Sequence, residues 1–269
     1  MNRAYATMLC GGDAYVPGVE ALGRSLVASG SREVKIVMVT SDVREPARER
    51  LARQGWIIRP IEALARPSQG DSALLPRFEN VYSKLRAWEL TDVEKVVFLD
   101  ADTVVVQNVD DLFDRPEITA APDFLMPDRF NSGVMVLEPS AATFQRMVSA
   151  LEHAESYDGG DQGFLNTFFA GWYAMPAEHR LPVGYNLFHF IFQFIHGHAG
   201  LRHTLEKEAK IIHYAVQKPW HAAPQLTGGS ATWWSMYYGA HPELDSKLRK
   251  KIHALEDWTF ERLVDLFIR

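Results

Sequence analysis

Two aspartates separated by one residue follow a run of apolar, β-forming residues. Asp100 and Asp102 come directly after Lys95-Val96-Val97-Phe98-Leu99, which predicts a buried strand. In an extended chain the side chains at i and i+2 point the same way, so these carboxylates would repel unless a cation or a proton lay between them. Carboxylate oxygens suit Mg²⁺ or Mn²⁺, and such an ion could bridge a substrate's diphosphate. The pair predicts a metal site, with a turn or helix cap as the alternative.

A histidine and a lysine further along the chain could complete such a site. His213 follows the apolar run Ala209-Lys210-Ile211-Ile212 and so is expected at a strand end. A neutral imidazole beside two carboxylates shifts the preference from Mg²⁺ toward Mn²⁺. Lys218 stands before the stiff pair Pro219-Trp220 and could hold diphosphate oxygens.

Two polar stretches could surround a sugar. Asn131-Ser132-Gly133 and Asp158-Gly159-Gly160-Asp161-Gln162-Gly163 combine amides and carboxylates, which can pair with several hydroxyl groups, with glycines that let the backbone approach closely. Each stretch alone is typical of a turn. Together with the metal motif they indicate a hexose pocket.

The same aspartates fit a second enzyme class. Val96 to Thr103 is similar to the first motif of haloacid-dehalogenase-type phosphatases, in which the first Asp is the nucleophile and the second the general acid. That motif usually begins the core domain, whereas three sheet elements precede it here, and the later acidic residues lack the expected spacing. The phosphatase is therefore the runner-up hypothesis.

The elements that must position these residues alternate between strand and helix. The pattern predicts strands at 5–9, 34–40 and 56–59 and helices at 17–28 and 45–54, a βαβαβ order typical of a parallel sheet. Ligands bind beyond the carboxyl ends of such strands, which is where Asp100 and Asp102 are expected. Further elements are predicted at the positions that follow: a loop at 66–77, a helix at 82–90, strands at 95–99 and 133–137, a helix at 141–152, a linker at 222–230 and a helical region at 247–268.

Composition describes an ordinary globular protein. The 269 residues carry a net charge of −6, which argues against a nucleic-acid or membrane-surface partner, since both favour basic proteins. One cysteine, Cys10, excludes an internal disulfide framework and fits a reducing compartment. The apolar stretch at 4–10 is too short for a signal peptide, and no stretch approaches a membrane span, so we expect a cytoplasmic protein.

An ordered set of motifs closely resembles the glycogenin-like glycosyltransferases of family eight. The resemblance covers roughly residues 4–221. It rests on Asp13-Ala14-Tyr15, Ser83-Lys84-Leu85, Phe98 to Thr103, Asp110-Asp111-Leu112-Phe113-Asp114, Phe130 to Gly133, Asp158 to Gly163, Tyr185-Asn186-Leu187, and His213 with Lys218-Pro219-Trp220.

The resemblance implies an α/β fold of the Rossmann-like GT-A type, with a mostly parallel central sheet flanked by helices and a C-terminal helical extension. It implies a catalytic domain at 1–221, divided into a nucleotide half (1–103) and a sugar and acceptor half (104–221), with 222–269 packed on the same domain. It also implies retaining transfer of galactose or glucose from UDP. The metal, Mn²⁺ with Mg²⁺ as the alternative, would bind Asp100, Asp102 and His213.

The same resemblance distributes the other roles. Leu9 and Tyr15 would hold uridine, Arg77, Lys84 and Lys218 the phosphates, and Ala101 the nucleotide. The sugar would face Asp123, Asn131, Ser132, Asp158, Asp161 and Gln162. Catalysis would fall to Asp161, Gln162 and Lys84, with Asp161 either a covalent nucleophile or, as we favour, a group that stabilises the oxocarbenium-like state during front-face attack.

Departures from the family pattern concern the acceptor. Glycogenin-like proteins glucosylate their own tyrosine shortly after Tyr-Asn-Leu, and here Gln193 stands at that position. The segment between His213 and Lys218 is also one residue shorter and lacks the expected glycine. We therefore expect a separate glycan or glycoprotein acceptor, as for the cytosolic protist α-galactosyltransferases that cap a glycan on the F-box ubiquitin ligase adaptor. A homodimer is expected, and a self-glucosylating primer and a nonenzymatic sugar-nucleotide-binding protein remain alternatives.

Overall fold

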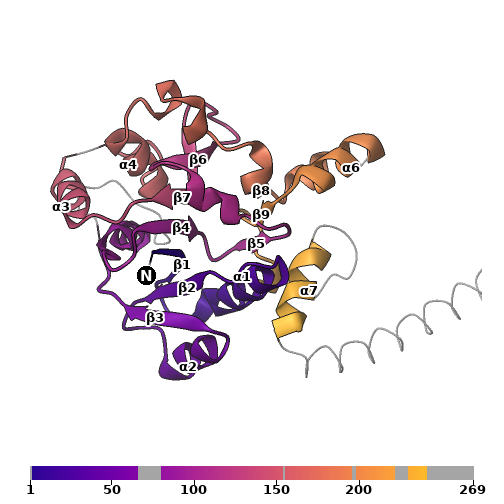
Figure 1. The fold of residues 1–269 in the computed structure, drawn as a ribbon, viewed down its shortest axis with the longest axis horizontal. Coiled ribbons are helices and arrows are strands. Elements are labelled where there is room, and N and C mark those ends of the chain that lie inside the picture. Colours follow the sequence, from indigo (N-terminus) through magenta and orange to yellow (C-terminus); the bar gives the residue numbers. More distant parts are fainter. Residues whose placement is uncertain (1, 66–79, 154, 196–197, 222–229, 241–269) are drawn as a thin grey trace, which may run out of the picture.

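A six-stranded sheet forms the centre of the computed structural model, which describes residues 2–65, 80–153, 155–195, 198–221 and 230–240 (Figure 1). Its strands are β1 (Arg3–Leu9), β2 (Val34–Val39), β3 (Trp56–Pro60), β4 (Lys95–Leu99), β6 (Thr119–Pro122) and β7 (Phe130–Leu137). Their order is β3-β2-β1-β4-β7-β6. The first four are parallel neighbours, and β7 runs antiparallel to both β4 and β6. The mostly parallel sheet that we expected is confirmed.

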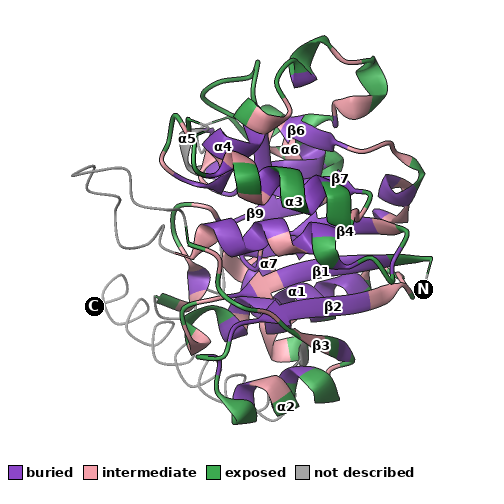
Figure 2. Ribbon diagram, turned by 90° about the vertical axis from the view of Figure 1, so that its left-hand side faces the viewer, coloured by how far each residue is buried: buried purple, intermediate pink, exposed green. Residues whose placement is uncertain are grey.

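Each face of the sheet is covered by helices because successive side chains point to opposite faces. Tyr5 and Leu9 of β1 belong to one buried cluster, and Ala4 and Ala6 to another. Helices α1 (Val16–Ala28), α2 (Glu45–Arg53) and the 3₁₀ helix η4 (Asp110–Asp114) cover the first face. The 3₁₀ helix η3 (Val81–Glu89), α3 (Ala141–Ala150) and α4 (Asp161–Phe168) cover the second. The central strands are accordingly buried, and the outer sides of α2 and α3 are exposed (Figure 2).

The sequence patterns located most of these elements within a few residues. The strand predicted at 95–99 is β4, and the helices predicted at 17–28 and 45–54 are α1 and α2. The segment predicted as a helix at 82–90 is a 3₁₀ helix. Strand β7 begins at Phe130 rather than Gly133, because the polar Asn131 and Ser132 interrupt the apolar pattern although both are buried.

A second, three-stranded sheet brings the later part of the chain to the end of β4. It consists of β5 (Thr103–Val105), β9 (Ile211–His213) and β8 (Leu187–Phe188), in the order β5-β9-β8. In its register, His213 pairs with Thr103 on one side and with Phe188 on the other. His213 therefore lies next to the turn that carries Asp100 and Asp102.

Helix α7 (Ser230–Ala240) lies along α1 (Figure 1). Trp233 is fully buried there in a third apolar cluster with Trp234 and Ala21. Ser230, which we expected to end a linker, begins this helix. The helical region predicted at 247–268 lies outside the described residues, so the extension and the division into domains stay predictions. The remaining helices are η1 (Asp13–Tyr15), η5 (Trp172–Ala174), η6 (Ala177–His179), η7 (Val183–Asn186), α5 (Ile191–Phe194), α6 (Ala199–Glu208) and η8 (Pro219–His221).

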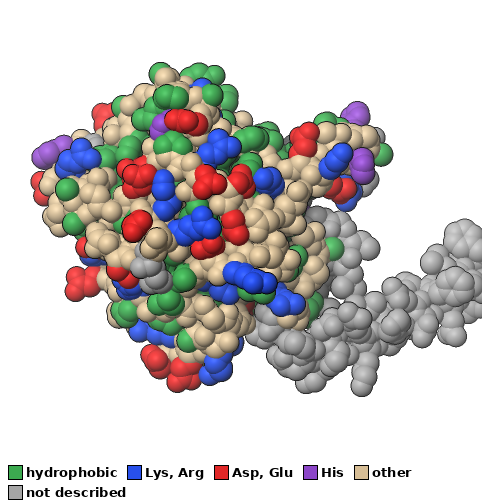
Figure 3. All heavy atoms as spheres, viewed as in Figure 1, with side chains coloured by type: hydrophobic (Ala, Val, Ile, Leu, Met, Phe, Trp, Pro, Cys, Tyr) green, Lys and Arg blue, Asp and Glu red, His purple; other side chains and the backbone are tan. Residues whose placement is uncertain are grey.

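Two surface properties bear on possible partners. On the face shown in Figure 3, acidic and basic side chains are interspersed. Among the described helices, none combines the length and apolar character needed to cross a bilayer.

Candidate active site

A tight turn between β4 and β5 carries the two aspartates. The backbone N–H and the hydroxyl of Thr103 both donate to the Asp100 carbonyl, at 3.0 and 2.7 Å. The Asp100 N–H donates to the Gly133 carbonyl of β7, at 2.8 Å. The segment is therefore a turn and not the extended chain that our i, i+2 argument assumed. Its carboxylates are nevertheless brought together, because both face the same histidine.

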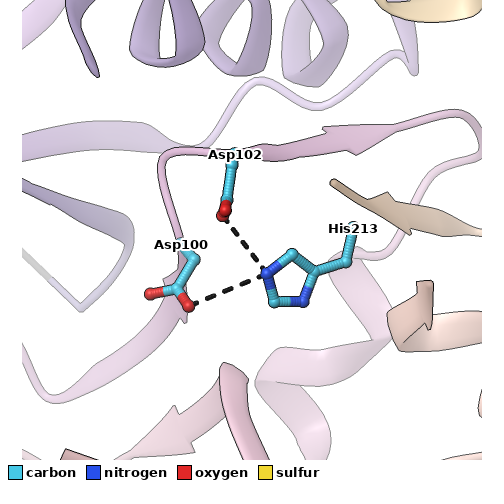
Figure 4. A group of neighbouring side chains, drawn as sticks. All are labelled: Asp100, Asp102 and His213. Carbon is cyan, nitrogen blue, oxygen red and sulfur yellow. Dashed lines mark ion pairs between the residues drawn. The ribbon is translucent and has the colours of Figure 1, made fainter. Parts of the chain in front are cut away.

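His213 lies between the two carboxylates (Figure 4). Its Nε2 is 3.2 Å from Asp102 Oδ1 and 3.9 Å from Asp100 Oδ2. Strand pairing sets this position, since the Tyr214 N–H donates to the Asp102 carbonyl at 2.9 Å. One ligand atom from each of these three residues lies within 4.8 Å of the others. The predicted metal ligands are thus gathered at one point.

The two carboxylates differ in their electrostatic surroundings. Burial and the nearby Asp102 raise the pKa of Asp100, against the opposing effect of Lys84 and His213. Burial acts in the same direction on Asp102, but His213 and Lys218 outweigh it and hold the pKa of Asp102 well below its usual range. The turn therefore combines a firmly ionised Asp102 with a carboxylate at Asp100 that binds a proton more readily, and a cation would compete for that proton.

Lys84 connects the turn that carries the two aspartates to Asp161. Its Nζ lies 2.9 Å from Asp100 Oδ1 and 2.6 Å from Asp161 Oδ2, and it donates to the Ser132 hydroxyl at 3.2 Å. Burial disfavours its charge, but the two carboxylates more than compensate and raise the pKa of Lys84 above its usual value. The ammonium is therefore charged, although its side chain is only 6% exposed.

Lys218 approaches from the opposite side. Its Nζ pairs with Asp102 Oδ2 and donates to the carbonyls of Tyr214 and Ala215 at 2.9 and 2.8 Å. It also lies 5.7 Å from the centre of the Tyr15 ring. These contacts place a second cation beside the turn despite the shortened segment between His213 and Lys218.

The predicted sugar-facing residues form a hydrogen-bond network at the start of β7 and α4. Asn131 Nδ2 donates to Gln162 Oε1 at 2.7 Å, and Gln162 Nε2 donates to Asp123 Oδ2 and to the Tyr157 hydroxyl, both at 3.2 Å. The Ser132 hydroxyl donates to Asp161 Oδ2 at 2.8 Å. Asn131, Ser132 and Asp161 are buried, whereas Gln162 and Asp123 are partly exposed.

Asp158 stands apart from this network and has a local structural role. Its Oδ1 accepts hydrogen bonds from the backbone N–H groups of Gly160 and Gly163, at 2.8 and 3.0 Å, and from the Ser156 hydroxyl at 2.8 Å. The residue itself is exposed. Asp158 thus shapes the loop that starts α4 and places Asp161 and Gln162.

A cavity of about 440 Å³ opens beside the turn and Lys84, and Lys218 is not among its lining residues. Of the predicted nucleotide ligands, Tyr15, Lys84 and Ala101 line it, together with Asp161. The Leu9 side chain is buried in the core instead, and Arg77 lies outside the described residues. The lining also includes Met8, Cys10, Gly11, Ala14, Asn80, Val81, Asp100 and Asp102.

This arrangement of carboxylates, imidazole and ammonium groups coincides with a match to a known family. Residues 6–223 match the model of glycosyl transferase family 8. The chain belongs to glycosyltransferase family 8. Glycogenin-1 from Caenorhabditis elegans is 36% identical over 245 residues, and human glycogenin-1 is 37% identical over 225. The inositol phosphorylceramide glucuronosyltransferase 1 of Arabidopsis thaliana is 42% identical over 166 residues.

These family 8 relatives are longer proteins. The matched regions span 90%, 81% and 62% of this chain but only 56%, 62% and 30% of the three relatives. The GT-A fold is also found in solved structures. The bifunctional glycosyltransferase WbbM superimposes with a TM-score of 0.64 at 18% identity, covering 88% of this chain and 49% of that one. The galactosyltransferase LgtC superimposes with a TM-score of 0.59 at 17% identity, covering 89% and 96%.

The donor set of this family 8 chain fits a divalent cation. Two carboxylates and an imidazole supply the O and N ligands that Mn²⁺ accepts. Three carboxylates, Asp100, Asp102 and Asp161, face the two ammonium groups of Lys84 and Lys218. With a neutral imidazole the cluster carries one negative charge, so a divalent cation would make it positive and attractive to a diphosphate.

Two residues next to this cluster received no role in our sequence analysis. Asn186 bonds both His213 and Asn131, and Tyr157 bonds Gln162. Asn186 belongs to the motif Tyr185-Asn186-Leu187, but the sequence pattern does not show that its buried amide lies between His213 and Asn131. Tyr157 adjoins the Asp158 loop, and its contact depends on how that loop folds.

Proposed function

We propose that this chain is a retaining hexosyltransferase that moves galactose or glucose from a UDP-sugar to a separate acceptor. The observation that carries the proposal is the cluster of Asp100, Asp102 and His213, whose two aspartates line a 440 Å³ cavity, in a chain of family 8. Tyr15 and Ala101, for which we propose contacts to the nucleotide, line that cavity. The names of the plant relatives add glucuronic acid to the donors that should be tested.

Mn²⁺, with Mg²⁺ as the alternative, would be held by the two aspartates and the histidine. When bound, such a cation neutralises the negative charge that develops on UDP as the glycosidic bond breaks. Lys84 and Lys218 would act on the same charge. Each already balances a carboxylate of the site, so a phosphate would compete for an ammonium group that is in place.

The stereochemical course depends on Asp161. Its Oδ2 is engaged by Lys84 at 2.6 Å and by the Ser132 hydroxyl at 2.8 Å. A carboxylate whose charge is held by an ammonium group and a hydroxyl is a weak nucleophile. We therefore favour front-face attack, with Asp161 and Gln162 stabilising the oxocarbenium-like state and the departing phosphate accepting the acceptor's proton.

The acceptor side offers an exposed apolar surface. Phe124, Leu125 and Met126 directly follow Asp123 and are 50%, 81% and 38% exposed. The Phe124 ring packs edge-on against Phe190, with ring centres 5.2 Å apart. A sugar ring has apolar faces that suit aromatic side chains, and hydroxyls that suit Asp123. This surface supports binding of a glycan that is separate from the chain.

The test is a panel of UDP-galactose, UDP-glucose and UDP-glucuronate with Mn²⁺ and simple glycoside acceptors. We expect turnover with one hexose donor and a product whose anomeric configuration, followed by NMR, is that of the donor. Absence of both turnover and thermal protection by every UDP-sugar would refute the proposal. Binding without any transfer would favour the nonenzymatic alternative.

Self-glucosylation is tested separately. Gln193 stands where the acceptor tyrosine would fall, so we expect the intact mass of the protein to stay unchanged after incubation with UDP-glucose and Mn²⁺. A series of hexose additions would contradict the separate acceptor. The phosphatase alternative requires a different family and is not proposed. A homodimer and a cytosolic location remain predictions.

A further inference from the structure

We propose that Asn186 is a positioning residue that fixes the hydrogen-bonding direction of His213 and joins the metal ligands to the sugar-facing amides. This inference rests on the proposed function, because it concerns the same site. Asn186 ends η7 directly before β8, and it is only 4% exposed. Its side chain lies between His213 and Asn131 and contacts both.

Both ends of the Asn186 amide are engaged. Oδ1 is 2.8 Å from His213 Nδ1, and Nδ2 donates to Asn131 Oδ1 at 2.7 Å. A buried amide with two well-formed hydrogen bonds has one favourable orientation, since turning it over would place donor against donor or acceptor against acceptor. The orientation is set by a neighbouring group that can only donate a hydrogen bond.

The backbone N–H of Gly133 is that group. It donates to Asn131 Oδ1 at 3.0 Å, so this oxygen, and not the amide nitrogen, must face both Gly133 and Asn186. Asn186 therefore presents its NH₂ group to Asn131 and its oxygen to His213. That oxygen only accepts, so His213 Nδ1 carries a proton. With a cation bound by the three residues, the neutral imidazole would then have its lone pair on Nε2, the atom that faces Asp100 and Asp102.

The ring of His213 is also held sterically. Phe188 lies against one side, with ring centres 5.3 Å apart. On another side is Gly133, where an added Cβ would lie 2.4 Å from His213 Cε1. The imidazole thus fits against a glycine, and its hydrogen bond to Asn186 sets which nitrogen meets a metal. Such outer partners raise the basicity of a ligating histidine.

The same chain of hydrogen bonds continues to the sugar side. Asn131 Nδ2 donates to Gln162 Oε1 at 2.7 Å, and the Ser132 N–H donates to the same oxygen at 3.3 Å. Gln162 must then direct its NH₂ group toward Asp123 and Tyr157. Asn186 therefore acts on two sites through two different atoms, with its oxygen serving the metal ligand and its nitrogen serving Asn131.

Two substitutions distinguish the contribution of the Asn186 oxygen from that of its nitrogen. Asn186→Leu removes both, and we expect Mn²⁺ affinity, measured by electron paramagnetic resonance without nucleotide, to fall about 10- to 100-fold. Asn186→Asp keeps an acceptor for His213 Nδ1 but places a second acceptor against Asn131 Oδ1. We expect its Mn²⁺ affinity to stay within about threefold of the unchanged protein, while KM for the UDP-sugar rises about tenfold or more. Asn108→Leu, at an exposed position away from the site, is the matched control.

A direct measurement does not depend on the variants folding. With diamagnetic Mg²⁺ bound, long-range ¹H–¹⁵N NMR of the unchanged protein should show a proton on His213 Nδ1. A proton on Nε2 instead would overturn the inference. Unaltered Mn²⁺ binding in Asn186→Leu, or equal losses of Mn²⁺ binding in both variants, would also overturn it. A wild-type chain that binds no Mn²⁺ would instead overturn the metal part of the proposed function, and this inference with it.

Discussion

At the scale of single residues, the site is held together by charge pairs that cross between elements. Lys84 from η3 reaches Asp100 at the end of β4 and Asp161 at the start of α4. Because its side chain is only 6% exposed, its charge is tolerated only with these partners in place. The lysine therefore contributes to the folded structure as well as to the proposed chemistry.

Substitution Lys84→Met tests this double role. It would leave two largely buried carboxylates without their cation, so we expect the free energy of unfolding to fall by about 3 kcal/mol and transfer to be lost. Urea denaturation measures the first effect. The exposed pair of Arg202 and Glu206 provides a control, since Arg202→Ala should change stability by less than about 0.5 kcal/mol. An unchanged urea midpoint in Lys84→Met would argue against the structural part.

Substitution Asp102→Asn tests the proposed metal ligands. Asp102 is the carboxylate whose pKa is held low, and it faces both His213 and Lys218. We expect Mn²⁺ affinity to fall by more than about 100-fold, because a direct ligand matters at least as much as its outer partners. Isothermal titration with Mn²⁺ gives the readout. Asp128→Asn, which alters an exposed carboxylate beside Arg129, should bind as the unchanged protein does.

At the scale of elements, the approach of α1 to the turn that carries Asp100 and Asp102 depends on a missing side chain. A Cβ at Gly18 would lie 2.2 Å from the Ala101 carbonyl oxygen and 3.0 Å from the Trp220 ring. Helix α1 can therefore approach the backbone between Asp100 and Asp102 only where it carries a glycine. Helix α1 consequently packs directly against Ala101, a residue that lines the cavity.

Substitution Gly18→Ala should push α1 and the turn apart. The clash is with backbone, so we expect a stability loss of about 1–3 kcal/mol and at least a tenfold weaker UDP affinity. Thermal denaturation and a UDP titration check the two effects. Gly200→Ala on α6 is the matched change, because no atom lies within 4 Å of its added Cβ, and it should be neutral or slightly stabilising. If Gly18→Ala and Gly200→Ala had the same stability and the same UDP affinity, the proposed clash between α1 and the Ala101 carbonyl would be contradicted.

The sequence could predict these elements where the signal lies within one short segment, and could not where it depends on contacts between distant segments. Strand β4 and the position of Asp100 follow from one apolar run, and the position of His213 at a strand end follows from another. The pairing of β5 with β9, which places that histidine at 3.2 Å from Asp102, joins segments about a hundred residues apart and leaves no local signal. The turn at Ala101 depends on that pairing, so the sequence pattern predicted extended chain there. The contacts of the Asn186 amide depend on it too, so the sequence indicated no role for this residue.

At the scale of the whole molecule, aromatic rings connect the C-terminal part of the described chain to the cavity beside the aspartate turn. Trp233 of α7 lies 5.3 Å from the Trp220 ring, and Trp220 lies 5.4 Å from the Tyr15 ring, measured between ring centres. Tyr15 lines the cavity. Helix α7 therefore supports the wall of the site from outside the two layers that cover the main sheet.

Substitution Trp233→Ala tests this support. Trp233 is fully buried, so its removal should lower the free energy of unfolding by about 3–5 kcal/mol. At temperatures where the variant is folded, we expect weaker UDP binding but Mn²⁺ binding close to normal, because His213 and both aspartates are held by other elements. Calorimetry and the two titrations separate these effects. The same loss for both ligands would show that α7 supports the entire site.

The contact between Trp220 and Tyr15 also gives the protein a built-in optical probe. Trp220 packs against Tyr15, which lines the predicted nucleotide cavity. A uracil ring arriving at Tyr15 would change the surroundings of that indole, so nucleotide binding should alter the intrinsic fluorescence of the unlabelled protein. A Trp220→Phe variant would identify the source of the signal, and donor preference could then be screened without knowing the acceptor.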